Sequence, residues 1–167
     1  MDASGSAVPD LGLGMTDTLR QPTCRPIAVT MLTIFWFWSL LIFAFFAVDL
    51  RSLSHSLSAA LCVMILVGLL MRSKLAALGH LVLVSLSLGV CLARIIFPAK
   101  PEDGPSAYVI VAGIIGAGAL YGLQTSSALR WFDLPSSRMM RLLYWAASGA
   151  IAVVAEFWFG IQFSRHA

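Results

Sequence analysis

Five apolar runs, each close to the length of a membrane-spanning helix, constrain this sequence more than any other feature. A helix needs about 20 apolar residues to cross the hydrocarbon core of a bilayer. The chain is 59% hydrophobic and only 11% charged, a composition that excludes ordinary soluble and disordered proteins. We therefore predict an all-α integral membrane bundle whose five transmembrane helices cover about 26–48, 54–71, 75–97, 107–123 and 142–163.

Short polar segments flank this five-span membrane domain, which covers residues 25–163. Residues 1–24 are rich in Gly, Ser, Pro and Asp and lack hydrophobic periodicity, which predicts a flexible N-terminal tail. They contain no short apolar region followed by a small-residue cleavage site, so we expect no cleaved signal peptide. Residues 164–167 form a short C-terminal tail.

The distribution of Lys and Arg predicts the orientation of the spans. One side of the membrane would hold seven basic residues, and the other side three or four. Because cytoplasmic loops carry the excess of positive charge, we expect a cytoplasmic N-terminus and, with five spans, an external C-terminus. The seven residues are Arg20, Arg25, Arg72, Lys74, Arg130, Arg138 and Arg141.

The third run carries polar residues in register. His80, Ser87, Cys91 and Arg94 are seven, four and three positions apart, which places them on one face of a helix. A span with one polar stripe should turn that stripe towards other protein and its aliphatic side towards lipid. We therefore expect this helix near the centre of the bundle. Together with Glu156 of the fifth run, the four residues form a candidate intramembrane polar site.

Three interpretations of these residues stay open. In the structural one, Arg94 and Glu156 form a buried ion pair that fixes the register of two helices, while His80 and Ser87 hydrogen-bond across the bundle. In the functional one, the pair guards an outward-facing cavity or binds a proton or anion, and water along Ser87 and Cys91 connects His80 with Glu156. In the third, Arg94 extends to water and Glu156 is protonated or paired elsewhere.

The fourth run is rich in small residues, and the first is rich in aromatic ones. Gly118-x-x-x-Gly122 matches the motif by which membrane helices approach closely, so we expect tight packing within one protomer or between two copies. The bulky first span should face lipid or a large partner. The four candidate helix-packing glycines are Gly113, Gly116, Gly118 and Gly122.

The connection Arg130–Arg141 combines basic and aromatic residues, a pattern typical of a segment at the membrane interface. It would either contact anionic lipid headgroups, or place aromatic rings at the membrane interface together with basic residues that set the orientation of the spans.

Sequence motifs for catalysis, cofactors and metals are missing. Cys24, Cys62 and Cys91 are isolated, with neither a C-x-x-C pair nor a His at metal-ligand spacing. The sequence lacks H-E-x-x-H, and one membrane-embedded His does not supply two haem ligands. No Ser has a nearby base with a third orienting group, and the basic residues are scattered at span ends and form no patch of the kind that binds nucleic acid. We expect no catalytic residue, no metal, no cofactor and no nucleic-acid partner.

Arg25-Pro26-x-x-Val29-Thr30 opens the first run, and Gly68-Leu69-Leu70 precedes the basic turn at Arg72. These short segments are similar to those of many small bacterial membrane proteins, a resemblance that implies no activity. We expect a multi-pass protein of the cell membrane, in a bacterial inner membrane.

The leading hypothesis for function is a non-enzymatic accessory, scaffolding or assembly subunit that acts through helix–helix packing. Its partners would be the lipid bilayer and either another membrane protein or a second copy of itself. The alternative is a small transporter or channel component that uses the polar stripe of the third span and Glu156. A membrane-embedded enzyme is the third hypothesis.

Overall fold

The computed structural model describes residues 24–49, 53–98 and 106–166, and every regular element in these ranges is a helix. The prediction of an all-helical chain is therefore confirmed for the described residues. The flexible tail predicted over residues 1–24 lies, apart from Cys24, outside them. The helices are α1 (Ile27–Asp49), α2 (Leu53–Leu70), α3 (Lys74–Ile96), α4 (Ala107–Leu123), α5 (Ser126–Trp131) and α6 (Arg138–His166).

Four of these helices are long and apolar enough to cross a membrane: α1, α2, α3 and α6. The shorter apolar helix α4 has 17 residues. The last long helix begins at Arg138, although the sequence pattern predicted a start at residue 142. Ser137 explains the earlier start, because its Oγ accepts a hydrogen bond from Met140 N at 3.3 Å and its carbonyl accepts one from Arg141 N at 3.0 Å.

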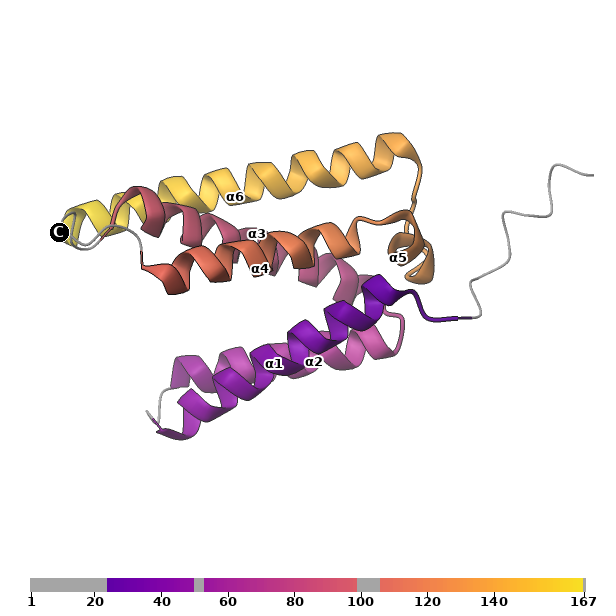
Figure 1. Cartoon of the computed structure of the whole chain (residues 1–167), viewed down its shortest axis with the longest axis horizontal. Helices are drawn as coiled ribbons and strands as arrows, with labels where there is room; N and C mark the ends of the chain where they lie inside the picture. The colour runs from indigo at the N-terminus through magenta and orange to yellow at the C-terminus, as the bar shows by residue number, and fades with distance from the viewer. Residues whose placement is uncertain (1–23, 50–52, 99–105, 167) are drawn as a thin grey trace, which may run out of the picture.

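Helix α3 joins two groups of helices. Figure 1 shows α1 and α2 side by side on one side of the molecule and α6 on the other, with α4 and the crossing helix α3 between them. Helix α3 packs against α2, α4 and α6, antiparallel to α4 and parallel to α6. Its most apolar stretch is 39% buried, against 11–17% for the other three long helices. The centre of the bundle is therefore built around α3.

A tight turn connects α2 with α3. Arg72 has a φ of 58°, in the left-handed region, and Ser73 caps α3 by accepting a hydrogen bond from Ala76 N at 3.4 Å. Gly68 allows the two helices to approach, because a Cβ placed on it would clash with the Cβ of Ala76. The turn therefore depends on a glycine at this position.

Helix α5 closes one end of the bundle. Its buried residues Ala128 and Leu129 pack there together with Phe132, which is 0% exposed. The α2–α3 turn lies against the same segment, since the Arg72 guanidinium lies 3.6 Å from the centroid of the Trp131 ring. Lys74 and Asp133 add a salt bridge of 2.6 Å. The connection Arg130–Arg141 is thus partly core and partly surface, and its place at the membrane interface stays a prediction.

Candidate functional site

His80 of α3 is fully buried and bonded through both ring nitrogens. Its Nδ1 accepts a hydrogen bond from the indole Nε1 of Trp36 in α1 at 2.6 Å. Its Nε2 donates to the carbonyl oxygen of Ala119 in α4 at 3.1 Å. Because an indole N–H only donates and a carbonyl only accepts, the ring carries its single proton on Nε2 and is neutral. His80 therefore connects three helices.

Packing around the imidazole holds this geometry. The Trp36 ring meets it edge-on, with centroids 5.8 Å apart and an interplanar angle of 70°. The Phe35 ring lies at 6.3 Å and 84°. The small side chain of Ala119 lets the α4 backbone come within hydrogen-bonding distance. These contacts leave one orientation for the ring, which is what a buried polar group requires.

The other three residues of the α3 stripe have different surroundings from His80. Ser87 and Arg94 are exposed, and Cys91 is half-buried. Cys91 faces α4, where its Cβ would lie 3.8 Å from a Cβ placed on Gly113. All four residues share one face in rotation, but neighbouring helices cover that face unevenly, so His80 bonds across the bundle while Ser87 is exposed.

Glu156 is half-buried on α6 and lies level with Gly89 of α3. A Cβ placed on Gly89 would lie 3.1 Å from the Glu156 backbone N. Arg94 follows Gly89 by five positions, which is about 7.5 Å further along the axis and about 140° around it. The Arg94–Glu156 ion pair stays a prediction.

The four glycines of α4 do not all face a neighbouring helix. Gly116 faces Val84 of α3 at 4.0 Å, and Gly122 faces Leu32 of α1 at 3.5 Å, both measured from an added Cβ. A Cβ on Gly118 would meet no atom of the described residues within 4 Å. Within the described chain, Gly118 and Gly122 therefore do not act as one close-approach pair.

Helices α3 and α6 approach each other closely at Gly89, which the sequence reasoning missed. An added Cβ there would lie 2.6 Å from the Cβ of Ala155 and would clash with the carbonyl oxygen of Ala152. A signal was present, since Ser85, Gly89 and Ala93 recur every four residues along α3, and all three are buried.

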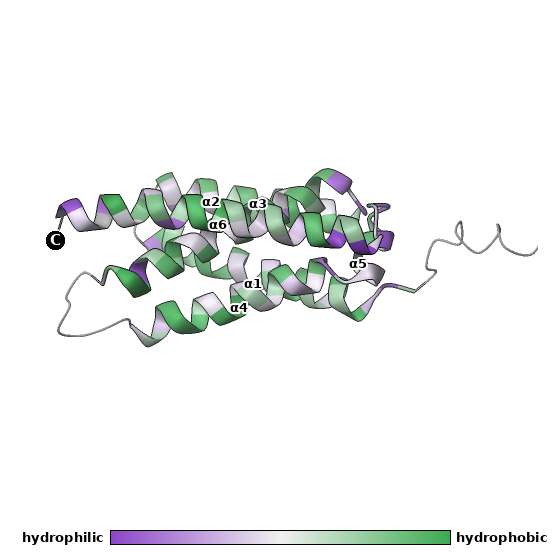
Figure 2. Ribbon diagram, turned by 90° about the horizontal axis from the view of Figure 1, so that it is seen from above, coloured by the Kyte–Doolittle hydropathy of each residue, from purple (hydrophilic) through white to green (hydrophobic). Residues whose placement is uncertain are grey.

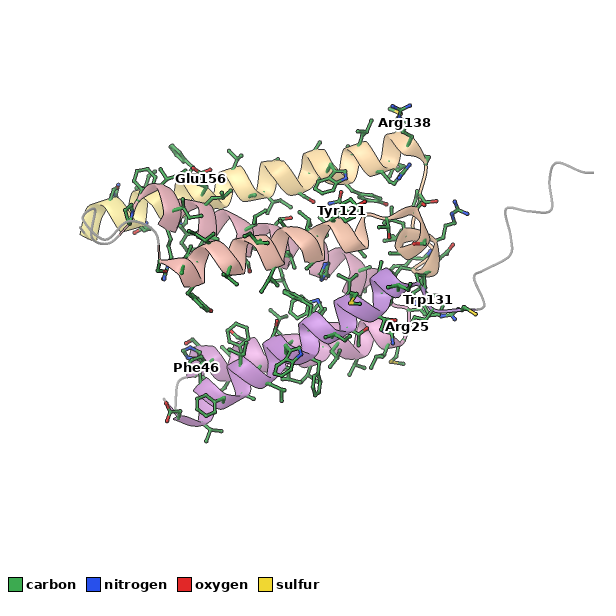
Figure 3. All side chains as sticks on the ribbon, viewed as in Figure 1. Arg25, Phe46, Tyr121, Trp131, Arg138 and Glu156 are labelled. Carbon is green, nitrogen blue, oxygen red and sulfur yellow. The ribbon has the colours of Figure 1, made fainter. Side chains whose placement is uncertain are left out.

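A pocket of about 440 Å³ lies where α4 ends and α6 begins. Figure 3 shows Tyr121 near the end of α4 and Arg138 at the start of α6, both towards the end of the bundle that carries α5. The sequence reasoning noted the arginines but missed the uncharged polar residues before them. The lining residues are Tyr121, Gln124, Thr125, Ser126, Arg138, Arg141, Leu142 and Trp145.

Gln124 is the most buried polar residue of this pocket, at 3% exposed. Its Nε2 donates to Ser148 Oγ at 3.2 Å, and that hydroxyl donates to the Tyr144 carbonyl at 2.8 Å. Within the described part of the chain, the buried atoms Gln124 Oε1 and Arg141 Nε have no hydrogen-bond partner. One acceptor and one donor at the pocket are therefore unsatisfied.

Metal-binding residues do not gather in the described ranges. Over residues 24–49, 53–98 and 106–166, no group of three or more His, Cys, Asp or Glu side chains is placed to hold a metal ion. Cys24, Cys62 and Cys91 are free thiols.

Comparison of the chain with protein-family models, curated proteins and solved structures gave no match. The geometry of its own residues therefore carries the functional inference.

Proposed function

We propose that the chain is a five-span integral membrane protein that acts as a non-enzymatic accessory, scaffolding or assembly subunit. Its helices would pack in the bilayer against another membrane protein or against a second copy of the chain. The N-terminus would face the cytoplasm of a bacterial cell, and the spans would cross the inner membrane.

The apolar surface of the helices supports a position in the bilayer. Between 11% and 17% of the most apolar stretch is buried in α1, α2 and α6, so most of their hydrophobic side chains face outwards. Figure 2 shows hydrophobic residues along the length of the helices and hydrophilic ones gathered near α5. In water, copies of the chain would associate through such a surface. In a membrane, lipid or a partner helix covers it.

Helix α4 supports the count of five spans. Its 17 residues extend about 26 Å, close to the thickness of the hydrocarbon core. It lies antiparallel to α3, as the next span of a multi-pass chain does.

Basic residues near α5 support the cytoplasmic orientation. The contacts of Arg72 and Lys74 with the α5 segment place the α2–α3 turn at this end of the bundle. Arg130, Arg138 and Arg141 belong to the same end, where α5 ends and α6 begins. Positively charged loops are retained in the cytoplasm.

The observation that carries the proposed function is the bonding of His80. A histidine that transfers protons needs a ring nitrogen within reach of a substrate or of water. Both nitrogens of His80 are instead bonded to neighbouring helices, at 2.6 and 3.1 Å. The imidazole acts as a structural connection, which is the role that a packing subunit requires of a buried polar group.

Exposed aromatic rings on α1 are the surface on which we expect a partner. Phe37 and Trp38 are 48% and 60% exposed, and Phe45 and Phe46 follow two turns later at 66% and 41%. Large aromatic side chains supply much of the contact energy in protein interfaces.

We expect the chain, extracted in a mild detergent, to elute in a particle that contains a stoichiometric second protein or a second copy of itself. The intact mass of the particle and the identity of each chain in it measure this. Trp38→Ala on α1 should release the partner, because it removes an exposed ring without touching the core. Met64→Ala, on the exposed face of α2, is the matched control. A particle with one copy of this chain alone would contradict the proposal.

A transporter or channel component is the second candidate, favoured by the half-buried Glu156 within α6. An ionisable group inside a span is costly unless it is paired or hydrated, and such groups mark ion and proton paths. If this candidate holds, Glu156→Gln abolishes a proton-dependent flux in vesicles that contain a pH-sensitive dye, while the amount of folded protein is unchanged. Under the accessory function, both the wild type and the variant leave the dye signal at the level of empty vesicles.

A further inference from the structure

We propose that the pocket between the end of α4 and the start of α6 binds one anionic phospholipid that carries a hydroxyl on its headgroup. The inference goes beyond the accessory function but rests on its placement of the chain in a bilayer. Four observations on the pocket support it.

The first is the charge of the pocket. Arg138 and Arg141 line it from α6, and Thr125 and Ser126 line it from the opposite segment, where the Thr125 hydroxyl already donates to the Gly122 carbonyl. Guanidinium groups bind phosphate oxygens through two parallel hydrogen bonds, and the Ser126 hydroxyl would add a further donor. The volume of about 440 Å³ falls in the range of about 300–1,000 Å³ that ligand pockets occupy. A phosphate ester therefore fits both the charge and the size.

The second is the pair of buried atoms that lack a partner among the described residues. Arg141 Nε is a donor, and Gln124 Oε1 is an acceptor. A phosphate oxygen would satisfy the donor, but the acceptor needs a ligand atom that carries a hydrogen. Because the Ser148 hydroxyl donates to the Tyr144 carbonyl, it accepts from Gln124 Nε2, and Gln124 Oε1 is the end left to accept. A phosphate diester whose headgroup bears a hydroxyl would satisfy both atoms.

The third is the change of polarity along the pocket. Arg138, Arg141, Leu142 and Trp145 occur at intervals of three, one and three residues, which places them on one face of α6. The two arginines come first, and Trp145 lies about 10 Å further along the axis of α6 than Arg138. At this end Tyr121 of α4 contacts Trp145, with ring centroids 6.4 Å apart. A charged end followed by an aromatic pair matches a lipid whose phosphate leads into acyl chains better than it matches a fully water-soluble phosphate.

The fourth is the place of the pocket in the bundle. It lies at the end that carries α5, where the basic residues gather. In the proposed orientation this end faces the cytoplasmic leaflet, where juxtamembrane basic residues meet anionic lipid headgroups. The ligand would therefore reach the pocket by lateral diffusion within that leaflet.

The test uses the full chain in detergent and native mass spectrometry to count retained lipid. We expect one phosphatidylglycerol to bind in preference to phosphatidylcholine. Arg141→Gln should weaken this binding about tenfold, because it removes hydrogen bonds to a charged group. Arg130→Gln is the matched control, since Arg130 is exposed at the same end, does not line the pocket and carries the same charge. An equal loss in both variants would indicate attraction to a basic surface and would overturn the proposal.

Gln124 gives a second readout, which a purely electrostatic site would not show. The wild type should prefer phosphatidylglycerol over phosphatidylmethanol, which has the same charge but lacks the hydroxyl. Gln124→Met should remove this preference while the binding of phosphatidylmethanol is retained. Equal binding of the two lipids by the wild type would overturn the role of Gln124 Oε1.

Further measurements distinguish the ways in which the lipid proposal and the accessory function could each fail. Displacement of the lipid by millimolar glycerol phosphate would assign the pocket to a water-soluble phosphate and overturn the lipid proposal. The thermal unfolding of each variant in the same detergent shows whether lost binding comes from lost folding, and Arg141→Lys then tests the guanidinium in a variant that keeps the charge. A chain that elutes without any partner protein but retains phosphatidylglycerol would contradict the accessory function and leave the lipid site supported.

Discussion

Replacing His80 with leucine is expected to lower the free energy of unfolding by about 2–3 kcal/mol. The substitution removes the acceptor for the Trp36 indole N–H and the donor to the Ala119 carbonyl. Trp36 is 5% exposed, so its N–H would stay buried without a partner, and an unsatisfied buried donor costs more than the lost bond contributed. Reversible unfolding of the chain in detergent micelles, followed by tryptophan fluorescence or circular dichroism, measures the change.

A double-mutant cycle attributes the loss to the hydrogen bond. Trp36→Phe removes the indole N–H, so the combination with His80→Leu should cost at least about 1 kcal/mol less than the sum of the single variants. Ser85→Ala serves as the control in the same helix, because the buried Ser85 hydroxyl bonds to the Leu81 carbonyl of its own helix at 2.7 Å. Its removal should change stability little. Strict additivity of His80→Leu and Trp36→Phe would contradict the connection between α1 and α3.

Replacing Gly89 with alanine is expected to separate α3 from α6 and to destabilise the bundle by about 1–3 kcal/mol. The added Cβ would lie 2.6 Å from Ala155 Cβ and would clash with the Ala152 carbonyl oxygen. Backbone atoms and a Cβ have no rotamer that moves them aside, so the helices themselves must shift. Chemical unfolding in detergent gives the free-energy change. Cysteine cross-linking between α3 and α6 reports the separation.

Gly118→Ala is the matched control for this prediction. Gly118 is also a glycine inside a helix, but an added Cβ meets no described atom within 4 Å. Alanine has the higher helix propensity, so the variant should be as stable as the wild type or more stable by about 0.5–1 kcal/mol. A loss as large as that of Gly89→Ala would contradict the packing described here. If Gly118→Ala breaks a dimer while the monomer stays folded, Gly118 packs between two copies of the chain.

Most of the secondary structure could be predicted from the sequence. Apolar runs bounded by Arg72–Lys74 and by Pro98 have few alternatives to helices, since a backbone in lipid must satisfy its hydrogen bonds internally. The early start of α6 was missed because Arg138 and Arg141 read as surface charges, although arginine is a good helix former and Ser137 caps the helix.

The partners of the candidate site could not be predicted. The spacing of His80 and Ser87 places both on one face of α3, yet His80 is fully buried and Ser87 is exposed. Spacing gives the rotation of residues about one helix, but it does not say which neighbouring helix crosses that face or at what height. Trp36 belongs to the run Phe35–Trp38, whose four aromatic side chains point to all sides of α1. The sequence therefore did not show which ring points inwards.

The sequence by itself determined that the described chain forms long apolar helices, and where the basic residues lie. These properties depend on local hydrophobicity and on the need of each helix to satisfy its own backbone. The tertiary structure decided that Trp36, His80 and Ala119 meet, that Gly89 packs tightly against α6, and that Gln124 joins Arg141 in one pocket. Each of these contacts depends on the height and angle at which two helices cross, which the packing of side chains from both helices sets together.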